Sequence, residues 1–200
     1  MIRRPPRSTL DRSSAASDVY KRQLMKGHFI LSSGLHSAEY LQCSKLTMYP
    51  KKLEIICKSL TEKIEKKYKN IDMIASPALG GIIVGYEVSR CLNIPNVFVE
   101  RVNQIFELRR NFSVKNKKIL IVEDVITTGK SSLECAACLI DEGADVLGYS
   151  SIVDRSDGKS LIKNEIISLI KFDIPCYDPE NLPEELKKIE PIKPGSRAAI

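Results

Sequence analysis

Short apolar stretches recur along the chain, separated by stretches with helical spacing. Residues 71–77 (IDMIASP), 96–100 (NVFVE), 117–125 (KKILIVEDV) and 145–155 (DVLGYSSIVDR) are apolar along most of their length, which predicts buried strands. The stretch 117–125 is the clearest, because four consecutive apolar residues precede two carboxylates. Such strands are typical of a sheet that is covered on both faces.

The intervening segments predict helices. Residues 50–69 open with a proline and repeat apolar residues at helical spacing. Residues 80–93, 129–143 and 163–170 (KNEIISLI) each follow a predicted strand and are also predicted as helices. Strands that alternate with helices in this way indicate an α/β fold whose doubly wound sheet is mostly parallel.

Both ends of the chain lie outside this alternation. Residues 24–49 contain a stretch, 27–43, that alternates apolar and polar positions around a Ser-Ser-Gly turn, as a short hairpin does. Together with residues 172–200 they are expected to form a small hood on a core of residues 50–171. Residues 1–23 are rich in Arg and Ser and have neither a regular period nor the apolar segment of a signal peptide. We interpret them as a non-native or disordered leader, and expect a single domain over 24–200.

Charge and cysteine usage exclude several classes of protein. The net charge is +6, but residues 1–23 carry +4 of it, so the patterned chain is nearly neutral and nucleic acid is not an expected partner. No apolar run approaches the ~18–20 residues of a membrane span. The six cysteines and two histidines show neither a disulfide framework nor zinc-finger spacing. Free thiols favour a reducing, cytoplasmic setting.

The chemistry is expected where the strand 117–125 ends. In an open parallel sheet, ligands bind where the carboxyl ends of strands lead into helix N-termini. Glu123 and Asp124 emerge at this strand end, and the turn that follows offers backbone N–H groups to a phosphate. Hydroxyl and ammonium donors in that turn would add to the phosphate site, and Gly129 would let the backbone approach closely. The two carboxylates could accept hydrogen bonds from vicinal hydroxyls, so the loop suits a sugar phosphate.

Other interpretations of this loop fit less well. A nucleoside triphosphatase loop would need glycine where Asp124 stands. The stretch ALGGIIVG (residues 78–85) lacks the spacing of a dinucleotide-binding fingerprint. The remaining alternative is that Glu123 and Asp124 are only solvated charges at a strand end.

The segment ILIVEDVITTGKSS (residues 119–132) closely resembles the diphosphoribosyl-binding signature of type I phosphoribosyltransferases. Residues 27–43 resemble the hood hairpin of the orotate phosphoribosyltransferase family, and residues 76–90 its pyrophosphate loop and following helix. Residues 100–112 (ERVNQIFELRRNF) are similar to its mobile catalytic loop, and SIVDRSDG (residues 151–158) to its orotate-contacting strand end. The resemblance runs in order over about residues 24–197, and implies a five-stranded core with a hood.

The resemblance also implies an activity and a set of site residues. The activity is transfer of ribose 5-phosphate from phosphoribosyl diphosphate (PRPP) to N1 of orotate, with Mg²⁺ as cofactor. The residues implied to bind PRPP are Glu123, Asp124, Val125, Ile126, Thr127, Thr128, Gly129, Lys130, Ser131, Leu79, Gly80, Gly81 and Arg101. Those implied to bind orotate are Thr127, Arg155, Tyr40 and Leu41, with Arg155 pairing with the orotate carboxylate.

Catalysis is implied for Arg101, Arg109, Arg110 and Asp124, in a homodimer whose Arg101 loop reaches across the interface. Mg²⁺ would be held mainly by substrate and water, with Asp124 acting at most through water. The loop has neither lysine nor histidine between residues 100 and 113, which leaves the general acid open. Arginine is a poor proton donor at neutral pH, so we interpret these arginines as electrostatic stabilisers. Arg109 and Arg110 have the alternative interpretation of a solvated basic pair.

Two other functions stay open from the sequence alone. One is a phosphoribosyltransferase that acts on a purine base, although such members usually stack the base on a hood aromatic residue. The other is a non-catalytic regulator of the same fold that binds nucleic acid. The nearly neutral core and the retained arginine loop argue against the regulator.

Overall fold

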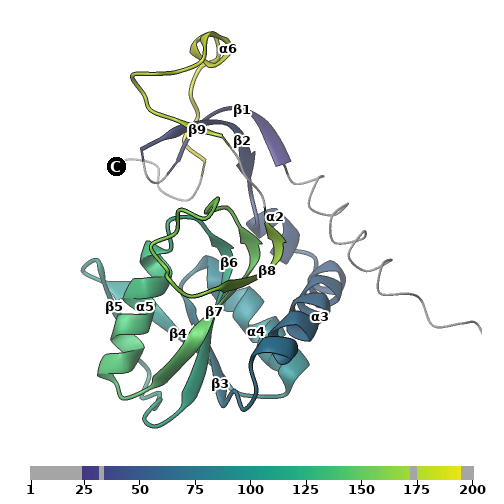
Figure 1. The fold of residues 1–200 in the computed structure, drawn as a ribbon, viewed down its shortest axis with the longest axis vertical. Coiled ribbons are helices and arrows are strands. Elements are labelled where there is room, and N and C mark those ends of the chain that lie inside the picture. The colour runs from purple at the N-terminus through teal and green to yellow at the C-terminus, as the bar shows by residue number, and fades with distance from the viewer. Residues whose placement is uncertain (1–23, 32–33, 172–174, 195–200) are drawn as a thin grey trace, which may run out of the picture.

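The computed structural model describes residues 24–31, 34–171 and 175–194. Its centre is a six-stranded sheet with the order β5 (Ile105–Glu107), β4 (Asn96–Val102), β3 (Met73–Pro77), β6 (Lys118–Ile126), β7 (Asp145–Asp154) and β8 (Ile166–Lys171) (Figure 1). Five strands are parallel, and only the short β5 runs antiparallel to its neighbour β4. The predicted mostly parallel five-stranded α/β sheet is therefore confirmed, with β5 as an added edge strand.

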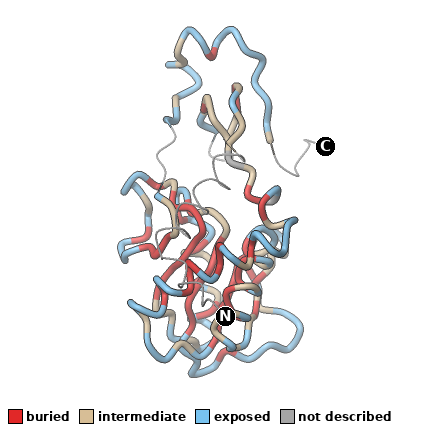
Figure 2. Tube along the Cα trace, turned by 90° about the vertical axis from the view of Figure 1, so that its right-hand side faces the viewer, coloured by how far each residue is buried: buried red, intermediate tan, exposed pale blue. Residues whose placement is uncertain are grey.

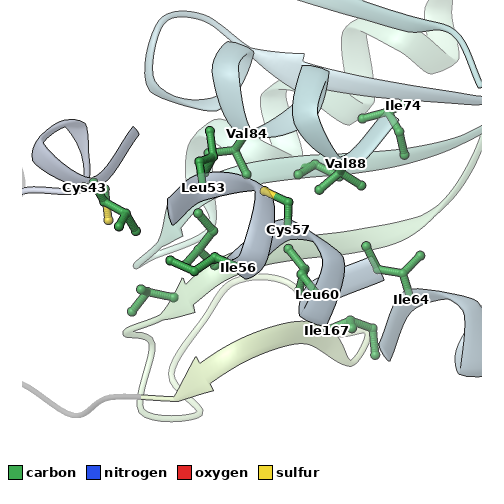
Figure 3. Packing of buried hydrophobic residues seen from close by; sticks show 14 of the residues in the cluster. Cys43, Leu53, Ile56, Cys57, Leu60, Ile64, Ile74, Val84, Val88 and Ile167 are labelled. Carbon is green, nitrogen blue, oxygen red and sulfur yellow. The ribbon is translucent and has the colours of Figure 1, made fainter. Parts of the chain in front are cut away.

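Helices cover both faces of the sheet. α3 (Pro50–Lys67) and α4 (Gly80–Leu92) pack on one face, and α5 (Lys130–Asp141) packs on the other. Successive residues of β6 divide between the two faces, because side chains alternate along a strand. Leu120 and Val122 join the cluster under α3 and α4, whereas Ile119 and Ile121 join the cluster under α5. Figure 3 shows the first cluster, where side chains of α3 and α4 meet over the sheet.

The prediction of a helix over residues 163–170 is wrong. Residues 166–171 form β8, which pairs in parallel with β7. Ile166 and Ile167 are consecutive β-branched residues, and both are buried. Two adjacent β-branched residues favour a strand at the edge of a covered sheet over a helix of about two turns. Its apolar spacing alone did not distinguish a buried strand from a helix.

Residues 100–112, which resemble a mobile catalytic loop, include regular structure. β4 continues through Arg101 to Val102, and β5 then pairs back on it. The turn between them consists of Asn103 and Gln104, both with positive φ. Two such residues make the tight turn that matches the twist of paired strands.

A second sheet forms the hood. β1 (Leu24–Ile30) and β2 (His36–Leu41) are antiparallel, and β9 (Cys176–Tyr177) pairs with β2. The chain beyond the short helix α6 (Glu184–Lys187) returns to β1, where Ile192 exchanges backbone hydrogen bonds with β1 at 2.8 and 2.9 Å. α2 (Ser44–Thr47) connects the hood to α3. Figure 2 shows burial concentrated in the large sheet, with the hood mostly intermediate or exposed.

The predicted leader, residues 1–23, lies outside the described residues. Among the helices that the structure describes, none has the length and apolarity needed to cross a membrane.

Candidate functional site

A hollow lies where β6 turns into α5. Its empty volume is about 270 Å³, part of it open to solvent. Gly129 has φ +77° and stands just before the first residue of α5, so the free N–H groups of that helix end face the turn. The positive end of the helix dipole adds to the attraction for an anion. The residues that line the hollow are Glu123, Val125, Ile126, Thr127, Thr128, Gly129, Lys130, Ser131 and Ser132.

The segment after β7 closes one side of this turn. The Leu161 N–H donates to the Thr128 carbonyl at 2.9 Å. A Cβ on Gly129 would lie 2.6 Å from Ser160 Oγ and 2.8 Å from a side-chain carbon of Ile162. Glycine is therefore required here for two reasons, its positive φ and the close approach of this segment. Ser160 and Ile162 were not anticipated from the sequence, because they follow the turn by some thirty residues.

Glu123 is buried beside the hollow. The Ser132 hydroxyl donates to Glu123 Oε1 at 2.8 Å. Burial raises the pKa of Glu123 to about 8; the Ser132 hydrogen bond lowers it and the nearby Asp124 charge raises it. Ser132 was not among the residues expected at the site, although it belongs to the same Gly-Lys-Ser-Ser stretch. Only the packing of α5 on β6 brings it to Glu123.

Asp124 faces a different neighbour. A Cβ on Gly80 would lie 2.8 Å from Asp124 Oδ2, so this carboxylate lies against the first residue of α4. The Val125 N–H donates to Asp124 Oδ1 at 2.9 Å, and burial raises the Asp124 pKa. The side chains of Glu123 and Asp124 therefore do not approach a ligand from the same side. Consecutive strand residues point to opposite faces, and these two point toward α5 and α4 respectively.

The segment Leu79–Gly81 lies beside this strand end. Leu79 precedes α4 with 80 % of its surface exposed, and the Ala78–Leu79 peptide bond is cis. Gly81 is buried, and a Cβ there would lie 3.1 Å from the Val122 carbonyl oxygen. The structure therefore brings the start of α4 and the start of α5 to the two sides of the end of β6. That placement follows from the parallel sheet, since carboxyl ends of parallel strands share one edge, and it agrees with the site that the resemblance implied for Leu79–Gly81.

Arg155 follows β7 at the same edge. Its backbone N–H donates to Ile126 at 2.8 Å, and its Nε is buried with no hydrogen-bond partner among the described residues. The hood approaches it through Tyr40, whose pKa is raised by burial, lowered by the Arg155 charge and raised by the Asp124 charge. Tyr40, Arg155 and Asp124 are therefore electrostatic neighbours. Leu41 ends β2 and pairs with Leu24.

The three loop arginines pair with acids of the same chain. Arg101 contacts Glu134 of α5 and donates to the Gln104 carbonyl at 2.6 Å. Arg110 contacts Glu100, which Arg109 approaches at 3.5 Å. The Arg110 guanidinium also lies 4.9 Å from the centre of a phenylalanine ring, that of Phe98. Among the described residues, their hydrogen-bond and ion-pair partners lie on β4, on α5 and in the turn between β4 and β5.

Known proteins define the class of this site. The phosphoribosyl transferase domain model matches residues 47–180, which include the large sheet and the hollow before α5. A curated relative, the orotate phosphoribosyltransferase of Methylorubrum populi, is 47% identical over 177 residues, which cover 88% of this chain and 90% of that protein. The chain therefore belongs to the orotate phosphoribosyltransferase family.

Solved structures agree on the fold. The orotate phosphoribosyltransferase of Mycobacterium tuberculosis has a TM-score of 0.66 at 22% identity, over 81% of this chain and 97% of that one. An adenine phosphoribosyltransferase from Thermoanaerobacter pseudethanolicus has a TM-score of 0.56 at 21% identity, over 67% and 88%. The fold is thus shared by enzymes named for different bases, and does not by itself select one.

Proposed function

We propose that this protein transfers the ribose 5-phosphate group of PRPP to N1 of orotate, giving orotidine 5'-phosphate and pyrophosphate for UMP synthesis. The observation that carries the proposal is the meeting of three features at one sheet edge. They are the hollow before α5, the start of α4 against Asp124, and the unpartnered Nε of Arg155. The hollow suits a phosphate, the start of α4 suits a diphosphate, and the Arg155 Nε suits a carboxylate.

The PRPP would lie across the end of β6. Its 5-phosphate would occupy the hollow and accept hydrogen bonds from the Val125–Ser131 segment, including N–H groups at the start of α5. Its ribose hydroxyls would meet the carboxyl groups of Glu123 and Asp124 from opposite sides of the strand end, since these side chains point toward α5 and α4 respectively. Its diphosphate would lie beside the backbone of Leu79–Gly81, the segment that leads into the first turn of α4.

Orotate would lie between the core and the hood. Arg155 is half-buried and its Nε–H is a buried donor without a partner among the described residues, which suits a carboxylate on a flat ring. Tyr40 and Leu41 would flank the ring, and the exposed Thr127 hydroxyl would contact its edge. An arginine here favours orotate over a purine base, which has no carboxylate.

The chemical step breaks the bond between ribose C1 and the diphosphate oxygen, and forms a bond from C1 to N1 of orotate. Positive charge builds on the ribose and negative charge on the departing pyrophosphate. Cationic groups aimed at the pyrophosphate stabilise the transition state more than the ground state. We assign that role to Arg101, Arg109 and Arg110. Closure of their loop would also keep water from competing with orotate.

Magnesium fits this site as a substrate-bound ion. The described residues contain no group of three or more His, Cys, Asp or Glu side chains that could hold a metal. Glu123 and Asp124 both have raised pKa values through burial, which makes them poor direct ligands for a hydrated ion. When bound, Mg²⁺ would neutralise charge on the diphosphate. Its ligands would be substrate oxygens and waters, with Asp124 acting at most through a water.

We further propose a homodimer in which Arg101 of each subunit serves the site of the other; within its own chain, Arg101 pairs with Glu134 and with the Gln104 carbonyl. The domain is proposed to span residues 24–200, with the hood formed by residues 24–49 and 172–200. The backbone bonds between Ile192 and β1 support that grouping. Free thiols support a cytoplasmic location; they are those of Cys43, Cys57, Cys91, Cys135 and Cys138.

The test is turnover with Mg²⁺ and PRPP, offered either orotate or adenine and followed by loss of base absorbance. We expect orotate to be consumed only when Mg²⁺ is present. Turnover of adenine alone would reject the assignment in favour of a purine enzyme. Absence of turnover, together with sub-micromolar binding of RNA or DNA at physiological salt, would favour a regulator.

A further inference from the structure

Arg101 is held on several sides within its own chain. Its Nη1 donates to the Gln104 carbonyl at 2.6 Å, and its Nη2 contacts Glu134. The guanidinium carbon also lies 4.0 Å from the centre of the Phe106 ring. Only 28% of the side chain is exposed. An arginine that merely solvated a surface loop would not have a carbonyl, a carboxylate and an aromatic face around it.

The backbone partner of Arg101 is placed by the hairpin. Asn103 and Gln104 form the two-residue turn between β4 and β5, and Val102 pairs with Ile105 across it. The same pairing sets Arg101 opposite Phe106. The hairpin therefore supplies the carbonyl and the ring, but neither of them carries a charge that would orient the guanidinium.

Glu134 supplies that charge from a different element. It lies in the second turn of α5, and its side chain is 36% exposed. Its other carboxylate oxygen lies 3.9 Å from Lys130 Nζ, at the first residue of α5 and on the wall of the hollow. The carboxylate thus stands between a cation that lines the phosphate hollow and the guanidinium of Arg101.

We propose that Glu134 is a positioning residue that orients the Arg101 guanidinium for the pyrophosphate; this inference rests on the proposed function. Of the five N–H donors of Arg101, one goes to Gln104 and one to Glu134, which leaves three for an anion. Two fixed donors and a ring face restrict the plane of the guanidinium, so less rotational freedom is lost when pyrophosphate departs. An exposed ion pair with no such role would affect turnover little.

The test is steady-state kinetics of Glu134→Gln in both directions of the reaction, with the wild type in parallel. We expect kcat/KM for PRPP to fall about ten-fold, and KM for pyrophosphate to rise in the reverse reaction. The KM values for orotate and orotidine 5'-phosphate should stay within about two-fold, since Arg101 does not face the base. Glu87→Gln is the matched control, because it removes an acid that pairs with Arg90 on α4. The control should leave these constants unchanged.

A double variant separates positioning from a general electrostatic effect. If Glu134 acts through Arg101, then Glu134→Gln added to Arg101→Ala lowers kcat/KM for PRPP no further than Arg101→Ala alone. Two results would overturn the role of Glu134 only. One is a double variant whose loss in kcat/KM for PRPP equals the product of the two single losses. The other is a Glu134→Gln variant whose kinetic constants equal those of an active wild type. A wild type without orotate transfer would overturn the proposed function and this inference together. Thermal unfolding of each variant shows whether the fold is retained.

Discussion

Glu123 is a buried acid whose proton affinity depends on folding. Its side chain lies between β6 and α5, and its pKa of about 8 is far above the ~4.3 of a free glutamate. The folded protein therefore keeps a proton that the unfolded chain releases between these two pH values. Stability from this group is complete below about pH 4 and is lost as the pH rises toward 8.

The variant Glu123→Gln should remove this dependence, because glutamine still accepts from Ser132 and does not titrate. Between pH 6 and 8, the melting temperature of the wild type should fall on the order of 5 °C more than that of the variant. Thermal unfolding monitored by circular dichroism measures both. Glu65→Gln, an exposed position on α3, is the control. Equal pH dependence in the wild type and Glu123→Gln would contradict the assigned burial effect.

Arg155 carries an unused buried donor. Loss of a charge-assisted hydrogen bond to the orotate carboxylate predicts a rise of roughly 10- to 100-fold in KM for orotate in Arg155→Met. The KM for PRPP should change less than about two-fold. Lys163→Met, an exposed cation further along the same segment, should leave both values unchanged. Initial-rate measurements decide, and an unchanged KM for orotate would remove Arg155 from the base site.

At the scale of elements, the site depends on how closely α4 packs on β3. Gly85 allows that packing: a Cβ there would lie 2.0 Å from Ser76 Oγ and 3.1 Å from Asn96 Oδ1. Both polar atoms are buried, without a hydrogen-bond partner among the described residues. Because they lie so close to Gly85, a side chain at this position would have to push α4 away from β3. The N-terminus of the same helix lies against Asp124.

Gly85→Ala should therefore destabilise the fold by about 1–3 kcal/mol through overpacking, even though alanine favours helices. For a chain of this length that corresponds to a fall of about 3–10 °C in melting temperature. Adding Ser76→Ala removes the nearest atom and should restore part of the loss. A Gly85→Ala variant as stable as the wild type would show that α4 can move away from β3 at no cost.

Elements also differ in how far the chain sequence predicted them. β6 was evident from residues 119–122, because an uninterrupted apolar run before two acids does not have the spacing of an amphipathic helix. β8 was mistaken for a helix, since Ile166 and Ile167 are buried by pairing with β7 and by the clusters on opposite faces of the sheet, contacts that local spacing does not reveal. The β4–β5 hairpin was missed because its turn is Asn-Gln, without the glycine that usually marks such turns.

At the scale of the whole molecule, the proposed exchange of Arg101 between subunits has a direct test. Arg101→Ala and Asp124→Asn should each keep only a small, measurable fraction of wild-type turnover, and mixing them after subunit exchange should restore activity. In a hybrid dimer one site has lost both groups and the other has both intact. A statistical mixture would therefore recover about a quarter of wild-type turnover. A mixture as inactive as its parts would place Arg101 in the site of its own chain.

The sequence by itself determined the layered fold and the loop that follows β6, because both depend on local order: apolar runs, a strand end, two acids and a turn with glycine. Tertiary structure decided where the side chains point. Glu123 turns to Ser132, Asp124 to Gly80, and Arg101 to Glu134, partners 9, 44 and 33 residues away in sequence. Contacts over such separations arise only when helices pack on a sheet, and no local pattern specifies them.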